Sequence, residues 1–228
     1  GMPGEGGPGG FEGGWSKLAR TPGSSGRGVG GGGWRSQSNV GGGSYATAGS
    51  APTGGLYGNS RILPLIGGSG GAGQGDNHPA TQSGPGGGGA ILIGAQGTIA
   101  IAGASAITAY GGATCTSGGG SGGAIRLIAE VVSGSGGLFA APLGGGQCYG
   151  LDGGMGRIRI ESVNRTFNGP SSPNFTDGSA LPVTIWPDTM VPVVRVVSLG
   201  AASVPLDPRA SFDFPLADVS LADPAAQT

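Results

Sequence analysis

The sequence predicts an all-β protein with essentially no helix: a short parallel β-solenoid, glycine-rich segments of the polyglycine-II kind and a C-terminal β segment. Glycine and proline interrupt nearly every window long enough for a helix, with 56 Gly and 17 Pro among 228 residues. Short apolar, β-prone stretches recur at a nearly constant spacing. Only 10% of the residues are charged, whereas a disordered chain usually stays soluble through charge.

Residues 1–58 are glycine-rich and are expected to form a bundle packed on the solenoid. Extended glycine strands can approach one another closely because they carry no side chains, and they can bond through backbone N–H and C=O groups. Scattered aromatic residues are expected to seal this bundle; they are Phe11, Trp15, Trp34, Tyr45 and Tyr57.

Residues 59–163 are expected to carry the solenoid repeats. Three segments align: GAILIGA from Gly89, GAIRLIA from Gly123 and GRIRIES from Gly156, with offsets of 123 − 89 = 34 and 156 − 123 = 33 residues. The alternation within them is typical of strands with one buried face. The alignment predicts two core columns, Ile91 with Ile125 and Ile158, and Ile93 with Leu127 and Ile160, and an outward column of Leu92, Arg126 and Arg159.

The two cysteines occupy equivalent places in the repeat, since 148 − 115 = 33. Stacked units bring equivalent residues about 4.8 Å apart, within the roughly 4.4–6.8 Å between Cα atoms that a disulfide needs. We predict a disulfide between Cys115 and Cys148, which implies an oxidising, extracellular compartment. The alternative is two free, buried thiols.

Residues 164–190 are predicted to be a linker, and residues 191–228 C-terminal strands. The strongest strand pattern is VPVVRVVS, from Val191 to Ser198. Because two strands do not form a stable sheet alone, we predict that this segment is an assembly strand between subunits. Its apolar residues are Val191, Val193, Val194, Val196 and Val197.

Matches to glycine-rich functional motifs are weak evidence for function here, because a chain with this much glycine contains several by chance. Residues 26–31 fit G-x-G-x-x-G, but the strand and helix that dinucleotide binding requires do not flank them. G-x-S-x-G occurs around Ser69 and Ser121, yet the only histidine, His78, lies in a polar loop. We therefore expect no enzyme, no catalytic residue, no metal site and no cofactor.

Charge and hydropathy narrow the partners further. The net charge is −1 and the 11 Lys and Arg are scattered, which argues against a nucleic-acid partner. No apolar stretch approaches the roughly 18–20 residues of a membrane span. A polysaccharide-degrading enzyme, which needs Asp, Lys or Arg clustered in a groove, is disfavoured because Lys17 is the only lysine.

Four segments together resemble a known group of proteins: PLIGGSGG at 64–71, GGGGAILIGAQGTIAIAG at 86–103, GSGGAIRLIAE at 120–130 and GRIRIES at 156–162. Over residues 55–163 the chain resembles large, glycine-rich, largely uncharacterised bacterial secreted or surface proteins with β-solenoid-like strands between glycine tracts. More loosely, the tracts are similar in kind to the polyglycine-II bundles of antifreeze and phage-adhesin proteins. The resemblance implies an extracellular structural role and no catalytic residues.

These features favour an extracellular or cell-surface structural protein, the subunit of a self-assembling fibre or surface layer. Copies are expected to join by strand addition and by stacking of solenoid ends, because both expose unpaired backbone groups. The expected partner is then a further copy of the chain. The alternative is a cell-surface adhesin or glycan-binding module, in which exposed aromatics touch a surface glycan; the candidates are Trp15, Trp34, Tyr110 and Tyr149.

Overall fold

The fold is described from a computed structural model of the chain. The structure describes residues 2–16, 23–36, 39–74, 82–143, 152–179, 197–199 and 202–204. Two compact units divide the chain, Gly1–Ile185 and Trp186–Thr228. The described residues form strands, turns and extended segments, and there is no helix among them.

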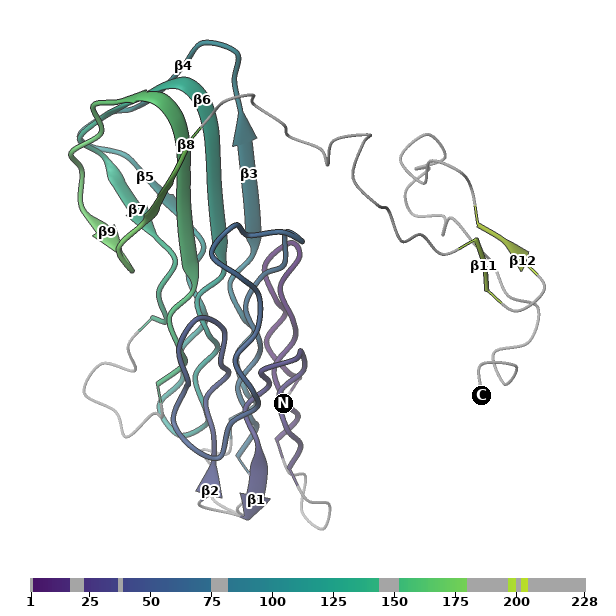
Figure 1. Cartoon of the computed structure of the whole chain (residues 1–228). Coiled ribbons are helices and arrows are strands. Elements are labelled where there is room, and N and C mark those ends of the chain that lie inside the picture. Colours follow the sequence, from purple (N-terminus) through teal and green to yellow (C-terminus); the bar gives the residue numbers. More distant parts are fainter. Residues whose placement is uncertain are drawn as a thin grey trace. The chain divides into compact units, whose positions relative to one another are not determined.

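Two parallel sheets form one end of the first unit (Figure 1). Their strands are β3 (Ala90–Gly94), β4 (Thr98–Ile101), β5 (Ala106–Thr108), β6 (Ala124–Gly134), β7 (Gly137–Phe139), β8 (Arg157–Arg165), β9 (Ser171–Ser172) and β10 (Thr176–Gly178). The larger sheet has the order β10–β8–β6–β3, and β4 also pairs with β6. The smaller sheet has the order β5–β7–β9.

The register of the larger sheet follows the repeat spacing. Ile91 lies opposite Ile125, which lies opposite Ile158. In the same way Ile93, Leu127 and Ile160 lie side by side. Since successive side chains of a strand point to opposite faces, these residues share one face of the sheet.

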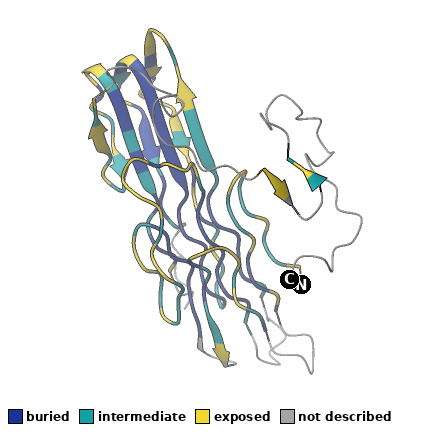
Figure 2. Cartoon of the chain, turned by 45° about the vertical axis from the view of Figure 1, so that its right-hand side comes forward, coloured by how far each residue is buried: buried dark blue, intermediate teal, exposed yellow. Residues whose placement is uncertain are grey.

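The main hydrophobic core lies along that inner face. It combines residues of β4, β6, β7 and β8 with Phe167, and residues of β3 and β5 are only partly buried against it. Burial is deepest in the central strands, as Figure 2 shows. Ile91 is accordingly half-buried and Ile93 is 36% exposed, because β3 is an edge strand with a neighbour on one side only.

Beyond the sheets, the glycine tracts form a bundle without strand structure (Figure 1). Each tract bonds to several neighbours in turn, with a period of three residues. In one tract the N–H groups of Gly68, Gly71 and Gln74 donate to the C=O groups of Gly88, Pro85 and Gln82. The positions between them donate elsewhere, Gly70 to Arg27 and Ala72 to Gly41. Three residues per turn is the period of the polyproline-II conformation.

Close packing of this bundle depends on glycine at particular positions. A Cβ atom on Gly118 would lie 1.8 Å from the carbonyl oxygen of Gly41. One on Gly123 would lie 1.9 Å from the carbonyl oxygen of Gly89. Neither distance leaves room for a carbon atom, so the absence of a side chain permits the backbones to meet.

The predicted solenoid is wrong. Only part of each repeat forms strands of the two sheets, and the glycine-rich remainder lies in the bundle. In the bundle, the tract at 118–123 bonds to tracts that precede the three aligned segments as well as to the equivalent tract of the first one. Gly43 donates to Gly119, Ser121 donates to Ser69, and Gly88 donates to Ser121. Glycine therefore forms a bundle of extended chains where the prediction expected the return turns of a coil.

Two short antiparallel pairs complete the described structure. In the first unit, β1 (Trp34–Ser36) pairs with β2 (Asn39–Val40). In the second unit, β11 (Ser198–Leu199) pairs with β12 (Ala202–Ser203), and the N–H of Val204 donates to the C=O of Val197.

Candidate functional site

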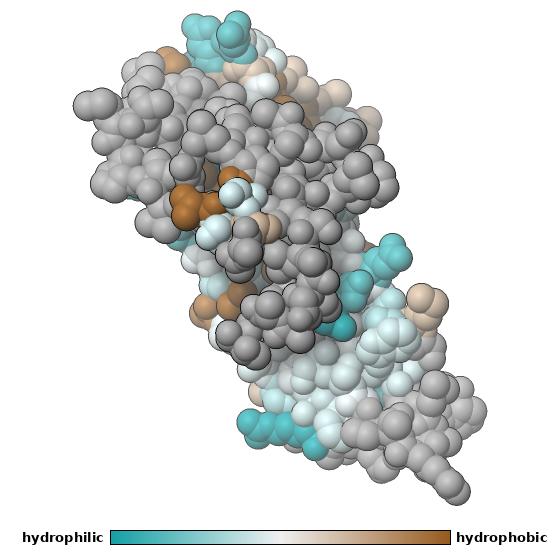
Figure 3. Space-filling view, turned by 90° about the vertical axis from the view of Figure 1, so that its right-hand side faces the viewer, coloured by the Kyte–Doolittle hydropathy of each residue, from teal (hydrophilic) through white to brown (hydrophobic). Residues whose placement is uncertain are grey.

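The strands of the first repeat, β3 and β5, are both edge strands, and they lie on the same flank of the first unit. In the strand orders β10–β8–β6–β3 and β5–β7–β9, the strand of the first repeat stands at one end, and strands of later repeats follow it in sequence. We call this side, formed by β3, β4 and β5, the open flank. In Figure 3, which views the molecule from the side on which β3 lies, the coloured atoms form small apolar areas beside neutral and hydrophilic ones.

Among the described residues, β6 is the strand that pairs with β3, and it lies on one side of β3. The N–H of Ala124 donates to the C=O of Gly89, and the N–H of Ala95 donates to the C=O of Ile128. In a parallel ladder these two bonds direct the odd-numbered residues of β3 toward β6. The N–H and C=O groups of Leu92 and Gly94 therefore point away from the sheet. The N–H of Ala90 also points away, and it donates to the C=O of Pro8.

The strand β5 repeats this arrangement. The N–H of Gly137 donates to the C=O of Ser105, and the N–H of Ala109 donates to the C=O of Phe139. The odd-numbered residues thus face β7, and the backbone groups of Ala106 and Thr108 face the open flank. Among the described residues, β5 pairs with β7 alone.

A half-open cleft of about 400 Å³ lies between the two edges. Its walls include Ile91 from β3 and Thr108 from β5, and Tyr110 stands at its rim, 38% exposed. The Tyr110 ring is stacked on Phe139, with centroids 5.9 Å apart and planes 10° apart, which holds it in place. The remaining lining residues are Gly7, Pro8, Gly89, Ala90 and Ala109.

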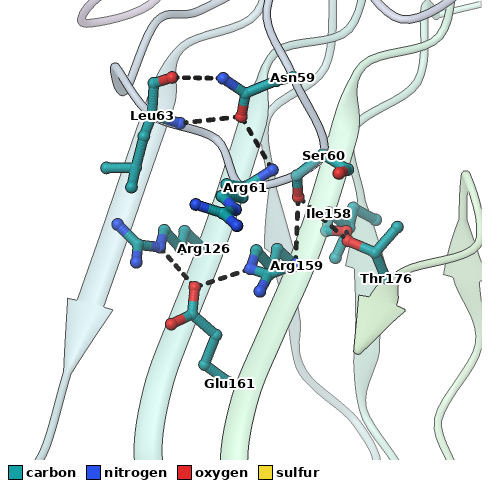
Figure 4. A network of polar contacts seen from close by, with 9 residues as sticks. All are labelled: Asn59, Ser60, Arg61, Leu63, Arg126, Ile158, Arg159, Glu161 and Thr176. Carbon is teal, nitrogen blue, oxygen red and sulfur yellow. Dashed lines mark hydrogen bonds and ion pairs between the residues drawn. The ribbon is translucent and has the colours of Figure 1, made fainter. Parts of the chain in front are cut away.

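The outer face of the larger sheet carries a buried ionic cluster beneath residues 57–66, which we call the covering loop (Figure 4). One carboxylate oxygen of Glu161 accepts hydrogen bonds from Arg126 Nε at 2.8 Å and from Arg159 Nε at 2.7 Å. Arg126 is 4% exposed and Glu161 is 9% exposed. The loop closes over them through the C=O of Ser60, which accepts from Arg159 and from Thr176.

Opposing effects act on the Glu161 carboxyl group. Burial raises its pKa, because it disfavours the charged form. Hydrogen bonds from Arg126 and Arg159, together with their charges, act more strongly in sum and lower the pKa below its ordinary value. Glu161 is therefore an ionised partner of both arginines.

Two tyrosine rings in contact, tilted by 32°, hold the other end of the covering loop. The rings of Tyr45 and Tyr57 lie 4.6 Å apart, and the guanidinium of Arg157 lies 5.4 Å from the Tyr45 ring centroid. The Tyr57 hydroxyl donates to the C=O of Gly67 at 2.7 Å and accepts from Ser69 Oγ at 3.0 Å. Burial raises the pKa of Tyr57 to about 12, because its effect is larger than that of the hydrogen bond with Ser69, which lowers the pKa.

The structure gives the two G-x-S-x-G serines packing roles. Ser121 Oγ accepts the N–H of Ser69 at 2.8 Å, and Ser69 Oγ accepts the N–H of Gly30 at 3.0 Å. Both serines are fully buried in the bundle. They satisfy backbone donors there, and neither faces a cleft.

The remaining predicted residues divide between described and undescribed parts of the chain. Cys115 is disulfide-bonded, and there is no free cysteine among the described residues. Val197 is 61% exposed. Outside the described residues lie Lys17, His78, Cys148, Tyr149, Val191, Val193, Val194 and Val196. The pairing of Cys115 with Cys148 thus stays a prediction.

The repeat pattern placed Arg126 and Arg159 in an outward column, which the structure shows to be buried with Glu161. Nothing in the sequence of residues 57–66 indicates that they cover this face. The open flank was not predicted as a site. The flank had a usable signal: β3 begins the first complete repeat, so no earlier equivalent strand can pair with it.

Comparisons add no relative from which a role could be transferred. The chain matches no protein-family model, no curated protein and no solved structure. The described residues contain no group of three or more potential metal ligands. A search of the same residues found no helix with the length and apolar character of a membrane span.

Proposed function

We propose that this protein is a structural subunit of an extracellular fibre or surface layer, whose copies join by strand addition at the open flank. The observation that carries this proposal is that β3 and β5, on one side of the same unit, each have an edge that no strand among the described residues pairs with. A strand edge presents rows of free N–H and C=O groups, which template pairing with another chain.

The sequence of these edges supports an assembly role. Edge strands are commonly protected by charged residues, by proline or by bulges. The strand β3 reads AILIG and β5 reads AIT, without a charge or a proline. Exposed Ile93 adds apolar area at the same edge. Unprotected edges of this kind favour association with another strand.

The glycine bundle supports a mechanical role in such an assembly. Backbone hydrogen bonds connect each tract to several others, so the bundle is cross-linked laterally along its length. The disulfide at Cys115 supports an extracellular location, because disulfides persist mainly in oxidising compartments.

Electron microscopy and sedimentation velocity of the full chain test the proposal. The informative variant is Leu92→Pro, which removes an N–H that faces the open flank and none that faces β6. Wild type should form concentration-dependent assemblies, and Leu92→Pro should remain monomeric with an unchanged circular dichroism spectrum. Leu56→Pro, at an exposed leucine outside the strands, is the matched control. A wild-type chain that is monomeric at high concentration contradicts the proposal.

A second candidate function is glycan binding at the cleft, favoured by Tyr110. Its ring is exposed at the rim and fixed by stacking on Phe139. A rigid aromatic surface beside open backbone groups suits a ligand with apolar and hydroxyl faces. Glycan-array binding that is lost in Tyr110→Ala but retained in Leu92→Pro would favour this function over strand addition.

A further inference from the structure

An incoming strand at β3 must meet definite backbone requirements. Next to Gly89 and Ala90 the edge is already occupied: the C=O of Gly88 accepts from Gly68, and the N–H of Ala90 donates to Pro8. Within the described part of the chain, the first group without a backbone partner is the C=O of Ala90, followed by both groups of Leu92 and the N–H of Gly94. A parallel partner can therefore begin its ladder only opposite Ile91.

The side chains of that partner must also continue the columns of the sheet. Residues opposite Ile91 and Ile93 face the core side and the cleft, so they must be apolar. The residue opposite Leu92 extends the outward column, in which Arg126 and Arg159 stand. The required pattern is apolar, any residue with an outward side chain, apolar.

One segment of the chain repeats the pattern of the paired strands. The strand β6 contains Ile125-Arg126-Leu127, and β8 contains Ile158-Arg159-Ile160. The C-terminal assembly segment contains Val194-Arg195-Val196. It thus reads as a further strand of the same kind, separated from the repeats by the linker.

We propose that Val193–Val197 of a second copy pairs in parallel with β3, with Val194 opposite Ile91 and Val196 opposite Ile93. This inference rests on the proposed function. Parallel direction follows from the sheet, in which every pairing is parallel. The segment belongs to the unit Trp186–Thr228 and not to the unit that bears the sheet. We assign it to a neighbouring copy because the proposed function joins copies at the open flank.

In this register the hydrogen bonds match position by position. The N–H of Val194 donates to the C=O of Ala90, and its C=O accepts from the N–H of Leu92. Val196 then bonds to the C=O of Leu92 and the N–H of Gly94 in the same way. Pro192 falls opposite Gly89, where both edge groups are already taken. The missing N–H of proline therefore leaves no group unpaired at that position.

The side chains fit the same register. Val194 and Val196 enter beside the cleft wall and cover Ile91 and exposed Ile93. Arg195 lies outward beside Leu92. Leu92 separates it from Arg126 by one strand, or about 9.6 Å at the usual strand spacing, so the two like charges are not adjacent.

Photo-crosslinking of the full chain tests this pairing. The probe is p-benzoylphenylalanine in place of Tyr110, at the rim of the cleft, with the same substitution at exposed Trp15 in the bundle as the control. Unlabelled and ¹⁵N-labelled copies are mixed, so that crosslinks between copies carry both isotopes. We expect mixed-isotope crosslinks from position 110 to peptides containing Val193–Val197, and none from position 15 to those peptides.

Two variants make the register falsifiable. Val194→Lys places an ammonium on the core side and should reduce the crosslink about a hundredfold, because a buried unpaired charge is strongly unfavourable. Arg195→Lys keeps an outward cation and should leave it unchanged. Copies that associate but crosslink elsewhere, or not at all, overturn this inference and leave the proposed function standing. Crosslinks only within one copy, or copies that never associate, overturn both.

Discussion

Arg126 and Glu161, 35 residues apart in the sequence, form a buried ion pair with Nε and Oε1 2.8 Å apart. The same oxygen also binds Arg159 Nε, so one carboxylate pairs with two guanidinium groups that neighbouring strands place side by side. Without it, the register of β6 and β8 would stack like charges beneath the covering loop. Glu161 therefore permits an arginine column inside the protein.

Replacing Glu161 should be strongly destabilising. Glu161→Gln leaves two largely buried arginines without their counter-charge, which should lower the free energy of unfolding by about 3 kcal/mol. Asp177→Asn is the control, because its pair with Arg165 is largely exposed and should contribute less than about 1 kcal/mol. Urea unfolding of both variants measures the difference. Equal losses of unfolding free energy in the two variants would show that the buried Glu161 cluster contributes no more stability than an exposed ion pair.

The contribution of Glu161 should depend on pH in a defined direction. Its pKa in the folded protein is lower than the ordinary value of 4.5, so the unfolded chain takes up the proton first on acidification. The stabilisation is therefore fully present above about pH 4.5 and is lost as pH falls through the folded pKa. Unfolding free energies of wild type and Glu161→Gln, measured from pH 7 to pH 3, should converge only at the acidic end. A constant difference across that range would contradict this account.

Gly123 should not tolerate even alanine. The added Cβ would lie 1.9 Å from the carbonyl oxygen of Gly89, so the tract must shift and the variant should lose about 3 kcal/mol of stability. Gly97→Ala is the matched control, since no atom lies within 4 Å of its added Cβ, and it should change stability by less than about 0.5 kcal/mol. Thermal unfolding of the two variants compares them directly. Similar melting temperatures would mean that the bundle adapts without loss.

The Tyr57 hydroxyl should be both hard to ionise and structurally important. Its pKa of about 12 predicts that ultraviolet titration will detect ionisation of this tyrosine only near that pH. Tyr57→Phe removes a hydrogen bond to Gly67 and leaves Ser69 Oγ without an acceptor, which should cost about 1–2 kcal/mol. Ser69→Ala removes the bond to the Tyr57 hydroxyl and also leaves the N–H of Gly30 without its acceptor, so it should cost at least as much as Tyr57→Phe. A loss of less than about 0.5 kcal/mol in Tyr57→Phe would argue against the assigned hydrogen bonds.

The predicted disulfide can be tested independently of assembly. Mass spectrometry under non-reducing conditions should recover the peptides of Cys115 and Cys148 as one linked species. The bridge would close a loop of about 33 residues, so reduction should lower stability by roughly 3–4 kcal/mol in the chain-entropy model. Recovery of free Cys148 would contradict the pairing and weaken the argument for an extracellular location.

The repeat period predicted the register of the sheet, but it did not predict where the sheet ends or which residues are covered. The spacing of 33–34 residues was sufficient to place Ile91, Ile125 and Ile158 in one row, because parallel pairing preserves that offset. It could not show that Ile93 is exposed, because exposure at an edge depends on what lies beyond the strand. Burial of Arg126 was equally hidden, since it comes from a loop 60 or more residues away whose sequence has no period.

The glycine tracts explain why the solenoid prediction failed. Alternating apolar and polar side chains predict a strand. A run such as Gly86–Gly89 has no side chains and therefore gives no such signal. The same letters can then serve as turns of a coil or as extended rods. Only the hydrogen bonds distinguish the two, by stepping through successive neighbours at Gly70, Gly71 and Ala72.

That stepping restricts how the length of the tracts can change. A single inserted or deleted residue in the tract at 67–74 would rotate every later N–H by one third of a turn, toward a neighbour that offers no matching carbonyl. A change of three residues restores the original direction of each group. The tracts should therefore lengthen and shorten in steps of three residues, because only such steps keep each N–H group directed at its carbonyl partner.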